Sequence, residues 1–265
     1  MKIAVCMKQV PSTAGPLQLD AASCWIREAD SAFEANAADV NALEEALRIK
    51  DKTGAEVVAI SLGPDRVAEI LREALAKGAD RAIHVVLPDS HALDPRELAR
   101  ILADTLHPNT LQPDTFQANR YDLVFAGLQS DDHGYGQVGV ALAEYLGLPH
   151  VSIVAEMLLG ENGQVRVRRE LEGGWFQWME LPLPCVLTIQ SGINKSRYAG
   201  IKGMLAAKKK TLERILAIVP EVIARQSAEQ LYLPYKTKET RMLTGSPEDM
   251  AAALIDTLNL RARLR

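Results

Sequence analysis

The residues best suited to chemistry lie in one glycine-rich stretch, Gly127 to Gly139, with the sequence GLQSDDHGYGQVG. It joins a short apolar segment to a segment whose apolar residues repeat at helical spacing. Backbone N–H groups at the start of a helix have no acceptors and lie at the positive end of the helix dipole, so they attract phosphate. The stretch indicates a nucleotide-binding loop, and the plainer alternative is a flexible surface loop.

The same stretch matches the dinucleotide fingerprint, because Gly134, Gly136 and Gly139 stand at the spacing GxGxxG. In a Rossmann domain this fingerprint directly follows the first strand. Here seven residues separate it from the preceding strand, which is the fourth in the chain. An NAD-dependent dehydrogenase is therefore the last of the functions that we consider, and it also lacks an evident acid–base pair.

No set of reacting groups accompanies the loop. His133 could act as a base oriented by Asp131 or Asp132, but no nucleophile stands near it in the sequence. The three cysteines are far apart and lack metal-ligand spacing, so they indicate neither a disulfide framework nor a zinc site. We expect a protein that binds a nucleotide without transforming it, with no catalytic residue and no metal.

The elements that must position the loop alternate between strand and helix patterns. Strands are predicted at 2–7, 56–61, 81–86 and 122–126, and helices at 36–52, 65–77, 94–106 and 138–146, with a polar loop at 107–120. This alternation predicts a doubly wound, mostly parallel, Rossmann-like α/β sheet. Ligands of such sheets bind beyond the carboxyl ends of the strands, which are followed here by the loops 8–16, 61–65, 87–94 and 127–137.

Asn36 and Asp39 begin the first predicted helix, where N-capping is the simplest function for both side chains. In a parallel sheet they would also lie beside the end of the first strand. Contact with a base or a ribose is the alternative.

The pattern changes after Pro149. Strands at 151–159, 165–171 and 175–181, separated by glycine turns, predict an antiparallel extension, and a further strand follows at 185–190. Then come a basic stretch at 194–214, an extended segment at 231–244 and an amphipathic helix at 246–258. We expect a nucleotide-binding domain over 1–190, followed over 191–265 by a docking loop and an arm that packs on another protein.

The composition restricts the possible partners. The chain has 265 residues, of which 48% are hydrophobic, and a net charge of −4, which argues against nucleic-acid binding. No apolar run approaches the roughly 20 residues of a membrane-spanning helix, and no signal peptide is recognisable, so we expect a cytoplasmic protein. Basic residues concentrate between Lys195 and Lys210, around Tyr198 and Ile201. Such a strip is either a solvated face or a docking site with an apolar anchor.

Together these segments resemble the β subunit of electron transfer flavoproteins, essentially from end to end. The resemblance is carried by the runs KIAVCMK (2–8), EEALRIK (44–50), SLGP (61–64), LAKGADRAI (75–83), RRELEGG (168–174), LPCVLT (183–188), GINKSRYA (192–199) and AAKKK (206–210). Members of this family are heterodimers with an α subunit that holds most of the contacts to a redox FAD. The resemblance implies an electron carrier that serves acyl-CoA dehydrogenases of fatty acid β-oxidation and passes electrons to a quinone oxidoreductase.

The resemblance also implies a structural AMP in the β subunit. Its contacts would be Cys6, Asn36, Ala37, Ala38, Asp39, Leu62, Gly127, Gln129, Ser130, Asp131, Asp132, His133, Gly134, Tyr135, Gly136, Gln137 and Val138. The family's partner-docking loop corresponds to 194–203, with Arg197, Tyr198, Ile201 and Lys202 as the implied contacts.

Some positions depart from the family pattern. Ala37 and Ala38 replace a usual Pro and Phe, and Ser196 replaces a usual proline. The run Gln137-Val138-Gly139 is shared with electron-bifurcating members, which hold a second FAD in place of AMP and oxidise NADH. His133 stands where those members have glycine, and its bulk disfavours a flavin. AMP is therefore the first expectation and a second FAD the alternative.

Overall fold

The structure is a computed structural model. It describes residues 1–20, 22, 24–106, 121–160, 163–219, 224–233, 240 and 242–263. The chain divides into two compact units, Met1–Leu231 and Tyr232–Arg265. The polar loop predicted at 107–120 lies outside the described residues.

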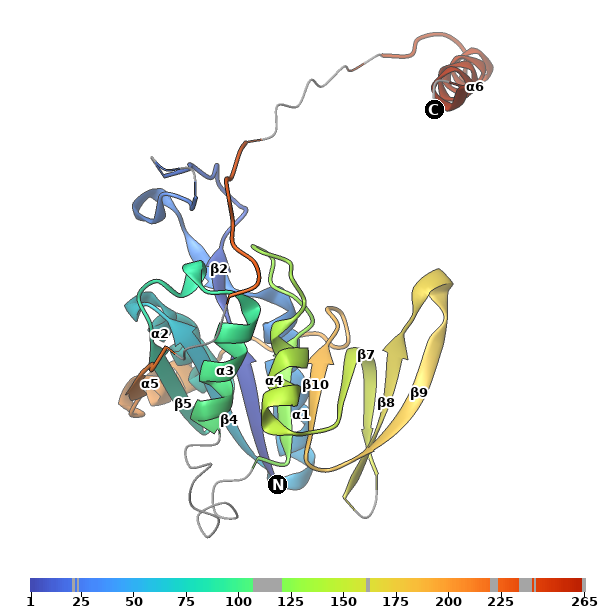
Figure 1. Cartoon of the computed structure of the whole chain (residues 1–265). Coiled ribbons are helices and arrows are strands. Elements are labelled where there is room, and N and C mark those ends of the chain that lie inside the picture. The colour runs from blue at the N-terminus through green and yellow to red at the C-terminus, as the bar shows by residue number, and fades with distance from the viewer. Residues whose placement is uncertain are drawn as a thin grey trace. The chain divides into compact units, whose positions relative to one another are not determined.

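One sheet of nine strands runs through the first unit in the order β11-β5-β4-β1-β6-β10-β7-β8-β9 (Figure 1). Neighbouring strands are parallel, except that β8 is antiparallel to both β7 and β9. The strands are β1 (Lys2–Met7), β4 (Glu56–Gly63), β5 (Arg81–Val86), β6 (Leu123–Gly127), β7 (His150–Leu159), β8 (Gln164–Glu170), β9 (Phe176–Pro182), β10 (Cys185–Ile189) and β11 (Glu213–Leu216). The predicted mostly parallel α/β sheet with an antiparallel extension is confirmed.

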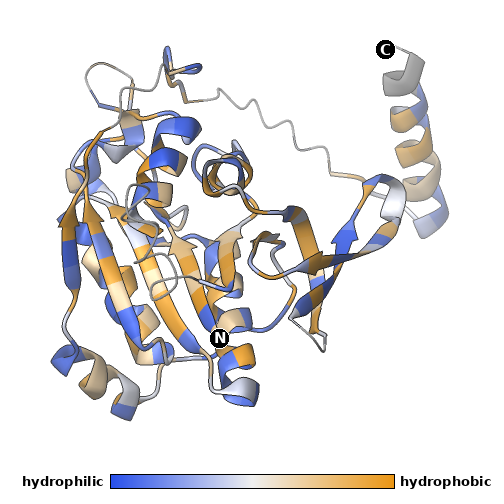
Figure 2. Cartoon of the chain, turned by 60° about the horizontal axis from the view of Figure 1, so that its bottom comes forward, coloured by the Kyte–Doolittle hydropathy of each residue, from blue (hydrophilic) through white to orange (hydrophobic). Residues whose placement is uncertain are grey.

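Helices cover both faces of the sheet (Figure 1). They are α1 (Ala37–Thr53), α2 (Ala68–Lys77), α3 (Pro95–Leu106), α4 (Val138–Leu146) and α5 (Ile201–Lys209). Alternate strand residues face opposite sides: Ile3 and Val57 pack with α1 and α2, whereas Ala4 and Val58 pack with α3 and α4. Apolar residues accordingly follow the central strands and the helix sides that face them (Figure 2). This is the doubly wound arrangement that the strand–helix alternation predicts.

Short elements complete the first unit. They are the two-stranded antiparallel sheet of β2 (Gln9–Pro11) and β3 (Phe33–Ala35), and the 3-10 turns η1 (Glu28–Asp30), η2 (Asp65–Val67), η3 (Ser90–Ala92) and η5 (Glu172–Gly174).

Local capping determines where α3 begins, as the sequence predicts. Asp94 Oδ1 accepts hydrogen bonds from the backbone N–H groups of Arg96 and Glu97 at 2.8 and 2.9 Å. The Glu97 carboxylate accepts from the N–H of Asp94 at 2.8 Å in return. The reciprocal pair satisfies donors that the first turn of a helix otherwise leaves unpaired.

The sequence does not predict α5 or β11, which fall in the segment assigned above to the docking loop and arm. β11 pairs in parallel with β5 at the sheet edge, and all four of its residues are exposed. An edge strand of this kind has no alternation of apolar and polar residues that would reveal it. Residues 201–216 therefore contribute a helix and an edge strand to the first unit.

The second unit contains α6 (Pro247–Arg263), which confirms the predicted last helix and extends it. Ser246 caps this helix, because its hydroxyl accepts from the backbone N–H of Asp249 at 3.2 Å. The extended segment predicted at 231–244 is described only in part. Among the helices of the described residues, none has the length and apolarity that a membrane crossing requires.

Candidate functional site

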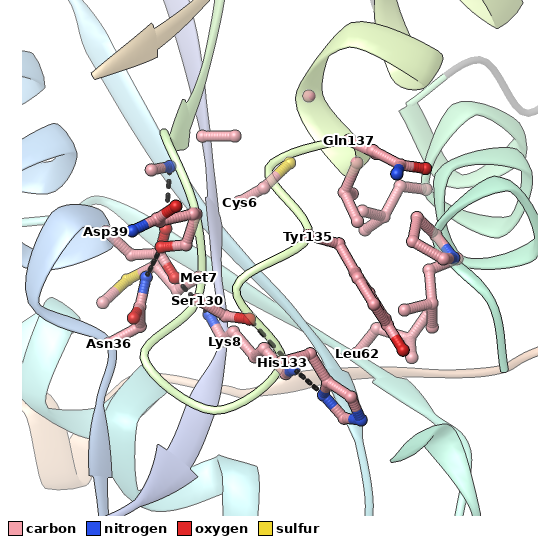
Figure 3. A pocket seen from close by; sticks show the side chains of 18 of the residues that line it. Cys6, Met7, Lys8, Asn36, Asp39, Leu62, Ser130, His133, Tyr135 and Gln137 are labelled. Carbon is pink, nitrogen blue, oxygen red and sulfur yellow. Dashed lines mark hydrogen bonds between the residues drawn. The ribbon is translucent and has the colours of Figure 1, made fainter. Parts of the chain in front are cut away.

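A pocket lies at the carboxyl ends of β1, β4 and β6, between the loop after β6 and the start of α3 (Figure 3). Counting the open space at its mouth, its empty volume is about 910 Å3. Cys6, Ile60 and Ala126 are paired in register on three adjacent strands and form its floor. Its walls are apolar on the side of Leu62 and α3 and polar on the side of the loop.

Most of the residues predicted to bind a cofactor line this pocket. They are Cys6, Asn36, Asp39, Leu62, Gly127, Gln129, Ser130, His133, Tyr135, Gly136, Gln137 and Val138. The predicted residues Ala37, Ala38, Asp131, Asp132 and Gly134 are not among the lining residues. Since Gly134 is the first glycine of the dinucleotide fingerprint, its position gives no support to binding through that motif.

Other lining residues are absent from the sequence prediction. They are Met7, Lys8, Ile60, Ser90, Leu93, Pro95, Leu98, Leu102, Ala126, Leu128 and Gly139. Several fall within or beside the strand-end loops 8–16 and 87–94, so the rule for parallel sheets could have located them. The residues on α3 had no such signal, because their apolar side chains read as ordinary core positions.

The buried carboxylate of Asp39 joins the first strand to the loop. Its two oxygens accept hydrogen bonds from the backbone N–H groups of Lys8 at 2.8 Å and Gly127 at 2.7 Å. Burial raises the pKa of Asp39 to about 7, although these two hydrogen bonds oppose the rise. A side chain at Gly127 would collide with the Asp39 carboxylate and with Ala38, so only glycine permits this close approach.

The simple interpretation of Asn36 as a side-chain N-cap is wrong. Its amide makes no capping hydrogen bond within α1. It donates to the carbonyl of Gln129 at 3.0 Å and accepts from the N–H of Asp131 at 2.9 Å. Asp131 in turn accepts from the N–H of Ala37 at 3.2 Å. The loop and the helix start therefore hold each other in place, which explains why Asp131 lies beside the pocket rather than on its wall.

Lys8 organises the polar side of the loop. Its amine donates to Asp132 Oδ1 at 2.7 Å and lies 3.2 Å from His133 Nδ1 (Figure 3). Burial alone would raise the pKa of Asp132, but hydrogen bonds from His133 and the charge of Lys8 outweigh burial and hold it well below its usual range. Asp132 is therefore an ionised structural partner at neutral pH.

The start of α4 borders the pocket through Val138 and Gly139. Among the described residues, the N–H groups of Val138, Gly139 and Val140 have no acceptor, as is general for the first turn of a helix. Gly136 just before the helix has a φ of 63°, a left-handed conformation that favours glycine. Such a helix start is suited to an anion.

A late segment of the first unit also reaches the rim. The backbone N–H of Arg225 donates to Asp94 Oδ2 at 2.6 Å, and Gln226 Nε2 donates to Gln137 Oε1 at 2.8 Å. Nothing in the local sequence indicates this contact, because it joins residues far apart in the chain.

Comparison with known proteins gives the family. A family model of the electron transfer flavoprotein domain matches residues 24–219. The electron transfer flavoprotein subunit beta of Methylophilus methylotrophus is 38% identical over 271 residues, covering 98% of both chains. This chain belongs to the electron transfer flavoprotein β-subunit family. The β subunit of Thermoanaerobacterium thermosaccharolyticum is 33% identical over 98% of this chain and 99% of its own, and that of Homo sapiens is 37% identical over 66% and 65%.

In this β subunit the predicted partner-docking residues have different environments. Tyr198 is 93% exposed and Ile201, the first residue of α5, is 75% exposed. Lys202 is also exposed. The Arg197 guanidinium instead contacts Glu44 at 2.9 Å and Asp51 at 2.8 Å on α1, and the Glu44 side chain is only 6% exposed. Arg197 thus anchors the segment, while Tyr198 and Ile201 present free apolar surface.

The thiol of Cys6 is buried at the floor of the pocket. Burial, followed by the nearby charge of Asp39, raises the pKa of Cys6 to about 12. Within the described part of the chain, no group of His, Cys, Asp or Glu side chains has the arrangement of a metal site.

Proposed function

We propose that this β subunit binds AMP in the pocket beyond β1, β4 and β6, as part of a heterodimer with an electron transfer flavoprotein α subunit. Family membership as a β subunit implies the α partner. The observation that carries the proposal is the combination of three features in one pocket. They are an apolar wall, a helix start with unpaired N–H groups, and the buried polar side chains of Asn36 and Asp39.

The residues present fit a nucleoside monophosphate. Leu62, Leu93 and Leu98 offer an apolar surface to an adenine ring. The free N–H groups from Val138 onward and the loop around Lys8 suit a phosphate. AMP in this place carries no electrons, and its binding free energy would stabilise the folded subunit.

Electron transfer belongs to the FAD of the complex, which supplies the redox chemistry when bound. We propose that the dimer takes electrons from dehydrogenases, acyl-CoA dehydrogenases of fatty acid β-oxidation first among them, and passes them to a quinone oxidoreductase. We infer that the described residues around the pocket perform no bond chemistry, because Asp132 beside it is an ionised partner of Lys8 and burial keeps the Cys6 thiol protonated. Their function is to hold the nucleotide and to present the surface around Ile201 to the donor.

A second FAD in place of AMP, in an electron-bifurcating complex that oxidises NADH, is the second candidate. It is favoured by Gln137 and Val138, which line the pocket and belong to the run shared with bifurcating members. It is opposed by His133, whose ring lines the same pocket.

The nucleotide content of the complex tests the proposal. The β subunit is co-expressed with its α subunit, the purified complex is denatured, and the released nucleotides are separated and quantified. One FAD and one AMP per complex are expected. Two FAD would support the bifurcating alternative, and an isolated β subunit that binds NAD would support a dehydrogenase.

A further inference from the structure

Four aromatic rings stack in a row, and two of them, His133 and Tyr135, line the pocket and are predicted as site residues. In spatial order they are His91, Trp25, His133 and Tyr135. Successive ring centroids are 4.8, 5.2 and 5.4 Å apart, with interplanar angles of 13°, 10° and 27°. These are separations at which aromatic rings attract each other. Figure 3 shows the rings of His133 and Tyr135 next to each other at the edge of the pocket.

Trp25 is fixed by contacts on its edge as well as on its faces. Its indole N–H donates to Glu28 Oε1 at 2.9 Å. The same carboxylate oxygen accepts from Arg66 at 2.7 Å, and the Arg66 guanidinium lies 3.9 Å from the centroid of the Phe33 ring. Arg66 belongs to η2, close after the pocket residue Leu62. The indole cannot leave its place between the two imidazoles without breaking this set of contacts.

The rings on either side of Trp25 belong to the two loops that border the pocket. His133 and Tyr135 lie in the loop after β6, where both line the pocket. His91 lies in η3 after β5, and its neighbour Ser90 lines the pocket as well. Trp25 therefore bridges these two loops from a third segment of the chain and supports the lining ring of His133 from outside the pocket.

The lining rings of His133 and Tyr135 belong to the loop that we propose for the phosphate. Tyr135 is three residues before Val138, the first residue of α4, whose unpaired N–H groups are the proposed partners of the phosphate. Of the apolar residues proposed above for the adenine ring, Leu98 comes from α3. A group attached beyond the phosphate would have to pass the stacked rings.

We propose that Trp25 is a positioning residue for nucleotide specificity: wedged between His91 and His133, it holds the lining rings of His133 and Tyr135 in place, so that the site accepts a nucleoside monophosphate and rejects nucleotides whose phosphate carries a further group. This inference rests on the proposed function that the pocket binds AMP. It adds two residues, Trp25 and His91, that neither line the pocket nor belong to the predicted site.

The test compares the binding of AMP, ADP and FAD to the αβ complex after its β-site nucleotide has been removed, by calorimetry. The wild-type complex is expected to bind AMP at least tenfold more tightly than ADP. In Trp25→Ala this ratio should fall at least fivefold while the affinity for AMP changes no more than about threefold. Trp25→Phe, which keeps a stacking ring, should preserve the ratio. Trp178→Ala, which removes an indole from β9, is the matched control and should leave all affinities unchanged.

His91→Ala provides a second route, because it removes the outer support of the indole without touching the pocket wall. It should lower the ratio in the same direction, which keeps the proposal testable if Trp25→Ala fails to fold. An unchanged AMP-to-ADP ratio in both alanine variants would overturn the proposal, and so would an equal loss of affinity for all three nucleotides. A wild-type complex that neither contains nor binds AMP would instead contradict the proposed function.

Discussion

The buried carboxyl group of Asp39 predicts how the stability of this β subunit depends on pH. Burial raises the pKa of Asp39 from an ordinary 3.8 to about 7 in the folded chain. Over the interval between these values, the folded protein holds a proton that the unfolded chain releases. The stabilisation from protonated Asp39 is therefore complete below about pH 4, and it is lost as the pH rises through about 7.

The structure gives the size of this effect. A tenfold change in proton affinity corresponds to about 1.4 kcal/mol, so a pKa raised from 3.8 to about 7 corresponds to about 4 kcal/mol. This amount is a large part of the total stability of an ordinary domain, which is about 5 to 15 kcal/mol. It should be visible between about pH 4 and about pH 8 against the titration of other groups.

The substitution Asp39→Asn isolates the contribution. Asparagine cannot titrate, but its NH2 group faces one of the N–H donors of Lys8 and Gly127, which costs about 1 to 3 kcal/mol at every pH. The variant should thus be less stable than wild type near pH 4. The stability difference between the two proteins should shift by about 4 kcal/mol in favour of the variant by about pH 8.

Denaturant unfolding of the αβ complex, repeated at a series of pH values, measures this difference. Asp104→Asn is the matched control, because Asp104 is an exposed carboxylate paired with Arg100 and should show no such dependence. A constant difference between wild type and Asp39→Asn from about pH 4 to about pH 8 would refute the reasoning. It would mean that the two backbone donors keep the carboxylate ionised in spite of its burial.

Three further predictions concern the loop and the docking surface. Asp132→Ala removes the partner of Lys8, so the bound AMP should decrease and the complex should melt at a lower temperature. The loss of stability has an upper scale of about 2.7 kcal/mol, which is what a ligand at one hundred times its Kd contributes. Unchanged AMP content would show that the pocket is misplaced. Ile201→Ala should slow electron transfer from the dehydrogenase at limiting concentrations, by the equivalent of about 2 kcal/mol, with an unchanged melting temperature, because its side chain is exposed; a large stability loss with normal kinetics would contradict this. Arg197→Ala should instead destabilise the subunit by about 1 to 3 kcal/mol, because the buried carboxylate of Glu44 loses the guanidinium and keeps only the hydrogen bond from the backbone N–H of residue 197. A melting temperature equal to wild type would refute that assignment.

Much of the fold follows from the sequence because its causes are local. The helix start at Asp94 depends on a side chain and the backbone N–H groups two and three residues later. The strand β1 is recognisable as a short apolar run, because a parallel strand that is buried on both faces has a nearly continuous apolar sequence. The pocket's place was also predictable, since the carboxyl ends of parallel strands meet at one edge of the sheet. The glycine-rich loop after β6 could be located in the same way.

Other features depend on contacts between distant segments. β11 has no recognisable pattern of its own and exists as a strand because β5 offers an open edge. Asn36 reads as a helix cap, but its amide finds better partners in the loop more than 90 residues later. Arg197 reads as one more cation of a basic strip until the fold places Glu44 and Asp51 beside it.

Trp25 is the clearest example of a residue whose contacts depend on the tertiary structure and not on the local sequence. Its type and neighbours in the sequence indicate no function, and its ring partners, His91 and His133, lie 66 and 108 positions further along the chain. Hydrophobic periodicity and capping act over a few residues, so they can be read from the sequence directly. Ring stacking, ion pairs between distant residues and a common pocket lining form only after the sheet has brought separate loops to one edge. The tertiary structure therefore determines which residues become partners.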